Sequence, residues 1–386
     1  MNKIVMVSFF KSNNLGDVVL SKSLYEIYNN SAAKIQCYDF TTISKVKPQT
    51  EITNRSEDSY LTLKGQINSR ISKVLKSSLY TKITFFIKRY TTDYKRWSTF
   101  SEALKGADEI VIGGGNMLMD IDETWPLLIS EYVRIAKKNN KKVYISHVGV
   151  GPLNSYLSKK LISNLRYSIE GISVRDLKSS NELVNSLNYN EEIITITADP
   201  AFSLYTEKPF NQIKNQIGIN VLSITCFLDE KTYTNYISEM VLFVKKLRVI
   251  FPQSTFVLFS TDAIDKNALN EVKNRLSFIN SEVMIFSGLN ELEQVYTNFE
   301  FILGGRMHAM IFAQKMNIPY IGVIWQEKIK SHFENVENPY CFQVEDFSTY
   351  KIDMKNIVKD LLSKENIDAM KIRNQYLKDK ALKGRF

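Results

Sequence analysis

The sequence predicts an α/β protein of two domains, each built on a parallel β-sheet. Three observations support this fold class. The 386 residues exceed what one ordinary hydrophobic core holds. Short runs rich in β-branched and aromatic residues alternate with longer helical patterns from end to end, which is typical of βαβ units. A polar stretch without apolar periodicity, residues 204–215, divides this alternation into two series.

The first series predicts an N-terminal domain over residues 1–205. Each expected strand is a short apolar run bounded by polar or turn-forming residues, and helical patterns fill the gaps between strands. The expected strands are Ile4–Phe10, Lys34–Phe40, Glu109–Gly113, Lys142–Val148, Gly171–Val174 and Glu192–Ala198.

Residues 41–106 interrupt this series with Ser-, Thr- and Lys-rich stretches around expected helices. We interpret this segment as a variable helical insertion rather than as part of the core. Aromatic residues gather towards its end, among them Phe85, Trp97 and Phe100. A helix face that packs on the domain is the simpler explanation, and a platform on which sugars stack is the alternative.

The second series predicts a C-terminal domain over residues 216–365. A charged helical tail follows over residues 366–386, and we expect it to pack on both domains. The expected strands of the second domain are Gln216–Ser223, Thr255–Ser260, Glu282–Ser287, Phe299–Leu303 and Pro319–Ile324.

Composition limits the classes of function. The three cysteines are far apart without a CxxC pair, which argues against a disulfide framework or a zinc site and favours a reducing, cytoplasmic compartment. The three histidines lack HxxxH spacing, so no metal is expected. No apolar run approaches the roughly 20 residues of a membrane-spanning helix. The short apolar start fits a strand better than a signal peptide.

The net charge of +9 and the isoelectric point near 9.1 indicate an acidic partner, such as a phosphate compound, an anionic lipid surface or nucleic acid. The basic residues are widely spread, and no nucleic-acid-binding module accompanies them. We therefore favour a solvated basic surface over nucleic-acid binding. Peripheral association with the inner face of a membrane stays open.

The most informative segment is FEFILGGRMHAMIF in the second series. An expected buried strand ends at Gly304 and Gly305, and a helix is expected to begin near Arg306. Backbone N–H groups and the positive end of the helix would then point into the crevice at the strand ends. Arg306 adds a guanidinium suited to phosphate or carboxylate, and His308 can transfer a proton. Lys328, after the next strand, reaches the same crevice. Alternatively, Arg306 forms an ion pair at the sheet edge and His308 only caps or packs.

The N-terminal segment NNLGDVV places Asn14, Gly16 and Asp17 at a strand-to-helix turn. An acidic residue at a helix N-terminus commonly interacts with the helix dipole or caps the helix, and this is the favoured interpretation of Asp17. The functional alternative is a general base that faces the acceptor across a cleft.

A glycine-rich run, IGGGNML, follows another expected strand of the first domain. Gly114 and Gly115, followed by Asn116, allow a ligand or backbone to approach closely, but the run does not match the dinucleotide fingerprint GxGxxG. The segment SVRD delivers Arg175 to the carboxyl end of a strand, where it could face the crevice. Asp176 beside it is expected to cap the next helix.

Taken together, these motifs resemble the polysaccharide pyruvyl transferase family. The match consists of NNLGD, IGGGNML, HVGVGPL, SVRDLKS, ADPAF and GGRMHAMIFAQKMNIPYIGV followed by Lys328, in this order, over residues 4–335. The resemblance implies two Rossmann-like domains in a GT-B-like arrangement with an interdomain cleft. It also implies transfer of a pyruvyl group from phosphoenolpyruvate to sugar hydroxyls, usually as a ketal, in a bacterial cell-surface polysaccharide or its precursor.

The resemblance also assigns roles to positions of this sequence. Arg306 and His308 match the family's donor site, and Arg175 and Lys328 belong to it by motif position. Asp17 would face the acceptor, which is a sugar or a lipid-linked oligosaccharide. Phosphoenolpyruvate would serve as donor without a cofactor.

Two other functions stay open. A GT-B-type nucleotide-sugar glycosyltransferase or epimerase would have the same architecture, because a fold does not fix a reaction. A catalytically inactive glycan-binding protein would use the same basic surface without turning over any donor.

Overall fold

The computed structural model describes residues 2–29, 33–48, 52, 78–204, 215–227, 229–276, 281–348 and 351–386. The chain divides into two compact units, each of which is described by itself. Unit 1 consists of Met1–Ser12, Asp17–Leu204 and Asp379–Phe386, and unit 2 of Asn13–Gly16 and Tyr205–Lys378. The predicted linker at 204–215 falls almost entirely outside the described residues.

Unit 1 is built on a sheet with the strand order β3-β2-β1-β4-β5-β6-β7. Neighbouring strands run parallel except β2 and β3, which are antiparallel. Two-residue β3 was not predicted. The strands are β1 (Lys3–Ser8), β2 (Lys34–Asp39), β3 (Lys45–Val46), β4 (Glu109–Leu118), β5 (Lys142–Val150), β6 (Gly171–Val174) and β7 (Ile194–Ile196).

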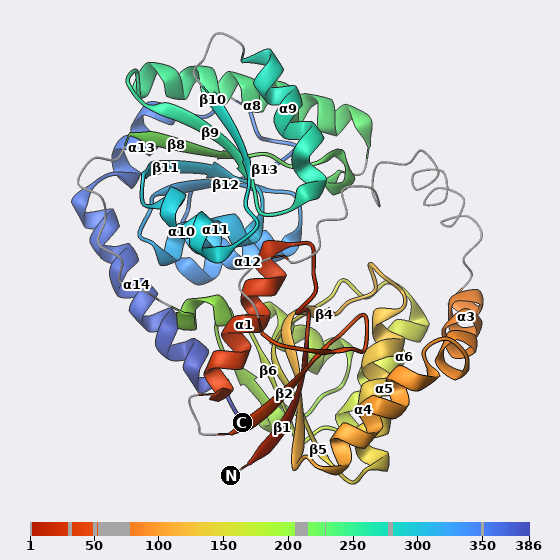
Figure 1. Cartoon of the computed structure of the whole chain (residues 1–386). Helices are drawn as coiled ribbons and strands as arrows, with labels where there is room; N and C mark the ends of the chain where they lie inside the picture. The colour runs from red at the N-terminus through yellow and green to blue at the C-terminus, as the bar shows by residue number, and fades with distance from the viewer. Residues whose placement is uncertain are drawn as a thin grey trace. The chain divides into compact units, whose positions relative to one another are not determined.

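Helices cover both faces of this sheet, as a parallel sheet requires (Figure 1). On one face, α1 packs Leu24, Ile27 and Tyr28 against β1 and β2. On the other face, α4 and α5 contribute to the main hydrophobic core. The helices of unit 1 are α1 (Leu15–Asn29), α3 (Ser78–Tyr90), α4 (Tyr94–Lys105), α5 (Trp125–Lys138), α6 (Tyr156–Asn164) and α7 (Leu177–Asn181).

The aromatic residues near position 100 belong to the core. Trp97 and Phe100 on α4 are buried and contact the ring of Tyr132 on α5. The expectation that the whole of 41–106 lies outside the core is therefore wrong for α4, because its apolar stripe packs on the sheet. For these two residues the helix-packing interpretation is confirmed. Residues 53–77 of the same segment lie outside the described residues.

Unit 2 is built on a second sheet, with the strand order β10-β9-β8-β11-β12-β13 and parallel pairing between all neighbours. The edge strand β13 was not predicted. The strands are β8 (Gln216–Asn220), β9 (Thr255–Ser260), β10 (Ser281–Ile285), β11 (Phe299–Gly304), β12 (Tyr320–Ile324) and β13 (Cys341–Gln343).

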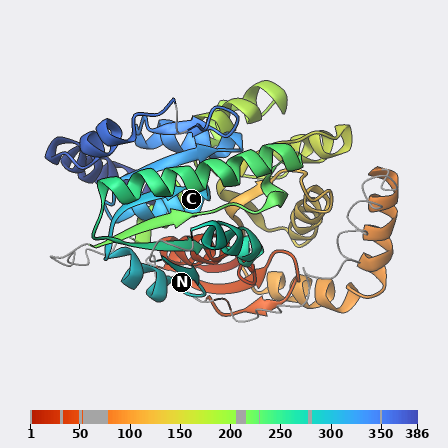
Figure 2. The ribbon, with the colours of Figure 1, turned by 90° about the horizontal axis from the view of Figure 1, so that it is seen from above.

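One face of the second sheet packs against α8, α9 and α13, which share a core with it. Figures 1 and 2 show the long α8 lying across this face. The other face carries the buried rings of Phe259, Tyr296 and Phe299, which contact one another. The helices are α8 (Glu230–Ile250), α9 (Lys266–Arg275), α10 (Leu289–Tyr296), α11 (Met307–Lys315), α12 (Glu327–Val336), α13 (Met354–Leu361) and α14 (Lys364–Lys383).

The C-terminal helix α14 contributes to both units, and its last residues belong to unit 1. Asn374 exchanges hydrogen bonds with Gln314 of unit 2. Beyond the helix, the Gly384 carbonyl accepts from Ser173 of unit 1 at 2.9 Å, and Phe386 stacks on Tyr144. The helical tail is thus anchored by buried polar contacts and does not extend as a free appendage.

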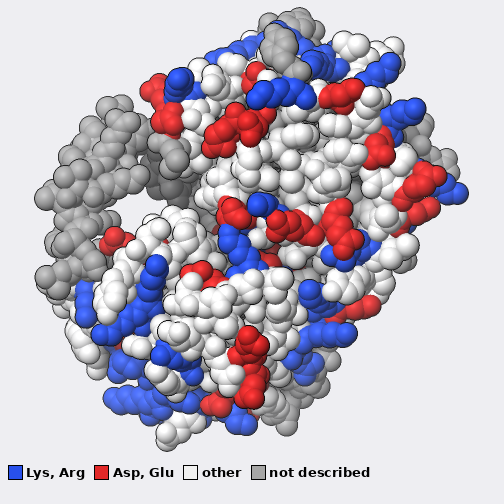
Figure 3. All heavy atoms as spheres, turned by 180° about the vertical axis from the view of Figure 1, so that it is seen from behind, with Lys and Arg blue, Asp and Glu red and all other residues white. Residues whose placement is uncertain are grey.

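On the face drawn in Figure 3, basic and acidic side chains are scattered between larger areas of uncharged residues. No helix within the described residues is long and apolar enough to cross a membrane.

Candidate functional site

The junction between β11 and α11 holds the most informative predicted motif. β11 ends at Gly304, and α11 begins at Met307 with Arg306 as its N-cap residue. The N–H groups of Gly305 and Arg306 both donate to the side-chain oxygen of Asn220, at 3.2 and 2.7 Å. Asn220 is fully buried at the end of β8. These two amides are therefore committed to the protein, which corrects the expectation that they point into the crevice for an anion.

The two glycines before Arg306 differ in how strongly packing restricts their positions to glycine. A Cβ atom on Gly305 would lie 2.6 Å from Leu222, so this position is glycine because the chain packs closely against that side chain. A Cβ on Gly304 would meet its nearest neighbour, Met310, at 3.4 Å. Gly305 thus fixes the turn by packing, and nothing comparable restricts Gly304.

Arg306 is held by a carboxylate that sequence reasoning missed. Its Nε and Nη2 groups donate to the two oxygens of Asp265, at 2.9 and 2.7 Å. Asp265 also accepts from the Ser260 hydroxyl and the Ser223 N–H, and it has no exposed side-chain surface. Such a fork-to-fork pair fixes the plane of the guanidinium. The structure therefore contains the Arg306 ion pair that the sequence analysis gave as an alternative.

Electrostatics around Arg306 keep it charged. Burial alone would lower the pKa of Arg306, but the adjacent Asp265 carboxylate outweighs burial and raises this pKa above its ordinary value. A second carboxylate, Asp262, lies 3.8 Å from Nη1. Burial raises the pKa of Asp262, and the positive charge of Arg306 opposes that rise. The guanidinium therefore faces two acidic groups, and its Nη1 edge is the part that Asp265 does not engage.

Trp325 connects the ends of β11 and β12. Its indole N–H donates to the carbonyl of Gly305 at 2.9 Å, so the ring is fixed beside the turn. The Arg306 guanidinium carbon lies 5.8 Å from the centre of this ring, and the Lys328 ammonium lies 5.7 Å from it. Both separations fall within the range of cation–π attraction. Two of the predicted cations thus meet at one aromatic side chain.

The NNLGD segment meets the same part of unit 2. The side chain of Asn14 donates to Asp262 at 3.3 Å, and the Leu15 N–H donates to the Thr261 carbonyl at 2.9 Å. A Cβ atom on Gly16 would lie 1.9 Å from Nδ1 of His308. Glycine is therefore required for the turn to pack against the imidazole. Two motifs far apart in the sequence are brought together at His308.

Asp17 follows this turn in the first turn of α1. Its carboxylate accepts from the Ser12 hydroxyl at 3.0 Å. The capping contact at this end of the helix comes from Asn14, whose side-chain oxygen accepts from the Gly16 N–H at 2.8 Å. Asn14 thus fills the capping role that we favoured for Asp17, and the role of Asp17 as a base stays a prediction.

A separate polar cluster lies in unit 1, at the carboxyl ends of β4 and β6. The Arg175 guanidinium donates to the side-chain oxygen of Asn116 at 2.6 Å and to Asp199 at 3.2 Å. Burial raises the pKa of Asp199, and Arg175 opposes that rise. Two predicted residues, Arg175 and Asn116, are thus in direct contact, with Asp199 as an unforeseen partner. Asp176 caps α7 as expected, through a 2.7 Å bond from the Ser179 N–H.

The backbone conformation explains why glycines occupy positions 114 and 115 in unit 1. Gly114 and Gly115 have φ angles of +78° and +125°, which side chains of L-residues rarely adopt. They bend β4 beside Ser8 and Phe9. His147, in the neighbouring strand β5, is fully buried, and its Nε2 lies 2.7 Å from the Ala381 carbonyl oxygen, so it is a satisfied core histidine rather than a catalyst.

The predicted site residues fall into two groups. Unit 2 gathers Arg306, His308, Lys328, Gly304, Gly305, Asn14 and Gly16, whereas unit 1 contains Arg175, Asn116, Gly114, Gly115 and Asp17. Whether the two groups meet in a cleft stays a prediction.

The residues that sequence reasoning missed in unit 2 are Asn220, Asp262, Asp265 and Trp325. Their common signal is that each lies at the carboxyl end of a strand of the second sheet or within five residues after it. Within the described residues, no three His, Cys, Asp or Glu side chains form a group able to hold a metal ion.

A model of the polysaccharide pyruvyl transferase family matches residues 14–327 of this chain. The match covers most of the chain, from the NNLGD turn to the start of α12. The protein therefore belongs to the polysaccharide pyruvyl transferase family, which is a family of enzymes. No sequence among curated proteins matched it.

Solved structures show the same fold at low sequence identity. A glycosyltransferase from Rickettsia africae ESF-5 is 13% identical with a TM-score of 0.55, covering 99% of this chain and 96% of that one. An S. aureus MnaA–UDP co-structure is 12% identical with a TM-score of 0.54, covering 100% and 93%. A putative UDP-N-acetylglucosamine 2-epimerase from Listeria monocytogenes is 9% identical with a TM-score of 0.54, covering 99% and 94%. The predicted α/β fold of two Rossmann-like units, as in GT-B enzymes, is confirmed.

Proposed function

We propose that this enzyme transfers a pyruvyl group from phosphoenolpyruvate to hydroxyls of a sugar in a bacterial cell-surface polysaccharide or its precursor. One observation supports it above all: in unit 2 the cations Arg306 and Lys328 meet at the ring of Trp325. His308, which can transfer a proton, lies two positions after Arg306 in the first turn of α11. The reaction would take place in the cytoplasm, where phosphoenolpyruvate is made, at or near the inner face of the membrane.

Phosphoenolpyruvate carries a phosphate and a carboxylate on one small planar framework. Arg306 would bind one of these groups through its Nη1 edge, because Asp265 engages Nε and Nη2. Lys328 would neutralise the other as a mobile point charge. Trp325 offers a flat apolar surface between the two cations, against which the methylene carbon of the donor can lie. Binding in this mode needs no cofactor.

The chemistry begins with a proton. His308 in its protonated form gives a proton to the methylene carbon, which becomes a methyl group and leaves C2 electrophilic. A sugar hydroxyl adds to C2, phosphate departs with its bridging oxygen, and a second hydroxyl adds to form the ketal. The two hydroxyl protons restore His308 and leave with the phosphate as hydrogen phosphate. General acid–base help of this kind contributes a factor of roughly 10² to 10⁴ in rate.

The acceptor side would be formed by the NNLGD turn and the polar cluster of unit 1. Asp17 would accept a proton from the attacking hydroxyl, since it directly follows Gly16, the residue that packs against His308. Gly114, Gly115 and Asn116 would line the acceptor path, and Arg175 would reach the donor. The acceptor is a sugar or a lipid-linked oligosaccharide.

The test is a donor assay with substitutions in unit 2. Purified wild type and the variants His308→Ala, Arg306→Ala and Lys328→Ala are incubated with phosphoenolpyruvate and a nitrophenyl or lipid-linked sugar. Phosphate release and product mass are measured. Lys330→Ala is the matched control, because Lys330 lies on α12 like Lys328 but is about half exposed and pairs with Glu334. With wild type and control, we expect the product to be heavier than the acceptor by one pyruvyl unit. For His308→Ala, we expect phosphate release to fall at least a hundredfold. A folded His308→Ala protein with full activity would rule out the proton-donor role.

A nucleotide-sugar reaction is the second candidate, because the solved structures with this fold include an MnaA–UDP co-structure. Thermal unfolding with each ligand separates the two. A ligand at 100 times its dissociation constant stabilises a protein by about 2.7 kcal/mol. Stabilisation by UDP but not by phosphoenolpyruvate would favour a glycosyltransferase or epimerase. Acceptor binding without turnover of any donor would favour a glycan-binding protein.

A further inference from the structure

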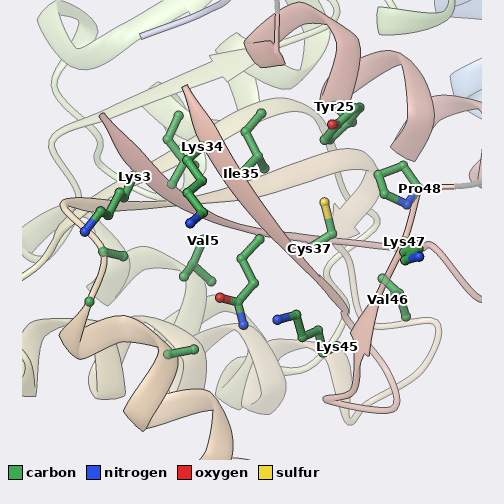
Figure 4. A pocket seen from close by; sticks show the side chains of 15 residues that line it. Lys3, Val5, Tyr25, Lys34, Ile35, Cys37, Lys45, Val46, Lys47 and Pro48 are labelled. Carbon is green, nitrogen blue, oxygen red and sulfur yellow. The ribbon is translucent and has the colours of Figure 1, made fainter. Parts of the chain in front are cut away.

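A cavity of about 470 Å³ lies in unit 1 at the amino ends of β1 and β2, and no predicted site residue lines it. Four lysines line it, namely Lys3 of β1, Lys34 of β2, Lys45 of β3 and Lys47 just after β3 (Figure 4). Its size is within the range of small-molecule sites. The cluster formed by Arg175 and Asn116 lies instead at the carboxyl ends of β4 and β6. The cavity is therefore a separate feature of unit 1.

Strand register explains why the lysines gather on one face of the sheet. In the β1–β2 ladder Lys3 lies directly opposite Lys34, and Val5 lies opposite Gln36. Residues opposite each other point to the same face, and residues two apart in a strand do so as well. Lys45 of β3 pairs with Tyr38, which shares this face with Gln36. Lys3 and Lys34 are like charges directly opposite each other, and although both are exposed to solvent, an anion bound between them would offset their repulsion.

The space above these lysines exists because small residues cover it. The lining from α4 and the turn after it consists of Ala103, Gly106 and Ala107. A Cβ atom added to Gly106 would meet its nearest neighbour only at 3.9 Å, so there is room beside the turn. Val5 contributes an apolar floor. The cavity is thus apolar at its base and cationic at its rim.

The charge balance of the cavity is one-sided. No aspartate or glutamate is among its described lining residues, and the four lysines form no ion pair with another described residue. Asp108, next to the lining residue Ala107, accepts a hydrogen bond from the Lys3 backbone N–H at 2.8 Å. The Gln36 side chain adds a neutral amide beside the cations, and its nitrogen donates one hydrogen bond to the Tyr38 hydroxyl at 3.1 Å.

We propose that this cavity is a second anion site, which takes a sugar carrying a phosphate or carboxylate group. The lysines would bind the anionic group, the Gln36 amide would bind a hydroxyl, and the floor formed by Val5 and Ala107 would contact the apolar face of the ring. The volume accommodates one or two sugar rings. This site does not depend on the proposed pyruvyl transfer, because it is defined by residues outside both predicted groups.

The test combines lysine footprinting with calorimetry. The full chain is acetylated briefly with and without glucose 1-phosphate, glucuronate or neutral glucose, and each lysine is quantified by mass spectrometry. We expect either anionic sugar to protect Lys34 and Lys45 at least threefold, and glucose to protect neither. Protection by the phosphate alone or the carboxylate alone identifies which anionic group the site takes. No protection by either anion, or equal protection by glucose, would overturn the proposal.

Calorimetric titration of the protecting sugar then compares two double variants of equal charge. Lys34→Gln with Lys45→Gln should weaken binding about tenfold or more, because two charge-assisted contacts are lost. Lys159→Gln with Lys160→Gln on the exposed side of α6 should leave it unchanged. Ala103→Phe fills the cavity without a change in charge and should also abolish binding. An equal loss in both double variants would show only a general effect of net charge and would refute the site.

Discussion

The ion pair between Arg306 and Asp265 gives the sharpest stability prediction. Asp265→Ala removes a fully buried carboxylate that accepts from both Nε and Nη2 of Arg306. The Arg306 side chain keeps only 13% of its surface exposed, so the guanidinium would stay in a low-dielectric site without its counter-ion. Removing one partner of a buried pair typically costs about 3 to 5 kcal/mol. We expect unit 2 to lose a free energy of unfolding of this size.

A double-mutant cycle separates the pair from the other contacts of Asp265. Asp265→Ala also removes an acceptor from Ser223 N–H and Ser260 Oγ, at roughly 1 to 3 kcal/mol for each unsatisfied group. Arg306→Met leaves those bonds in place and removes only the guanidinium. The double variant should then lose less than the sum of the two single losses, by about 2 kcal/mol or more, because no unpaired charge is left.

Tryptophan fluorescence reports on unit 2 during urea unfolding. The chain has three tryptophans, and Trp325 is the one in unit 2, whereas Trp97 and Trp125 belong to unit 1. The cycle is therefore measured in a background with Trp97→Phe and Trp125→Phe, in which the signal comes from Trp325 beside the pair. Additive losses, or a loss below about 1 kcal/mol for Asp265→Ala, would refute the argument that the pair fixes Arg306.

Two further predictions concern Gly16 and His147. Gly16→Ala places a methyl group 1.9 Å from Nδ1 of His308, so we expect at least a tenfold loss of phosphate release, and wild-type activity in a folded Gly16→Ala protein would contradict this packing. Burial lowers the pKa of His147 to about 4 from 6.5. Its contribution to stability is therefore complete above pH 6.5 and is lost as pH falls towards 4, by at most roughly 1.4 kcal/mol per pH unit, because the unfolded chain takes up the proton first. The difference in unfolding free energy between wild type and His147→Gln should shrink over this window, and a constant difference would contradict the assignment.

The sequence predicted the buried strands well because apolar runs bounded by turn residues carry a strong signal. β6 and β9 begin and end at the predicted residues, Gly171–Val174 and Thr255–Ser260. The missed strands β3 and β13 are two and three residues long and lie at sheet edges. Such strands are too short for an alternating pattern, and only pairing with a neighbour defines them. Their absence from the prediction therefore has a physical cause.

The partners of the site residues could not be predicted in the same way. Asn220 binds the N–H groups of Gly305 and Arg306 from 85 and 86 positions away, and it can do so because β8 lies next to β11 in the sheet. That adjacency comes from strand order, which periodicity does not reveal. A glycine pair before a helix indicates a sharp turn in any protein. Whether its amides bind an anion or a buried asparagine depends on the neighbouring strand.

Counting cations in the sequence overstates the positive charge that the predicted site residues of each unit offer. Arg306 faces Asp265 and Asp262, and Arg175 faces Asp199 and Asp176, so each predicted donor-site arginine is held beside two carboxylates. Such arginines contribute orientation more than net charge, since their planar forks are fixed before any ligand arrives. A lysine at position 306 would retain the charge, but its ammonium lacks the planar fork that engages both oxygens of Asp265 through Nε and Nη2 and still presents the Nη1 edge to an anion. The structure therefore favours arginine at this position for its geometry rather than for its charge alone.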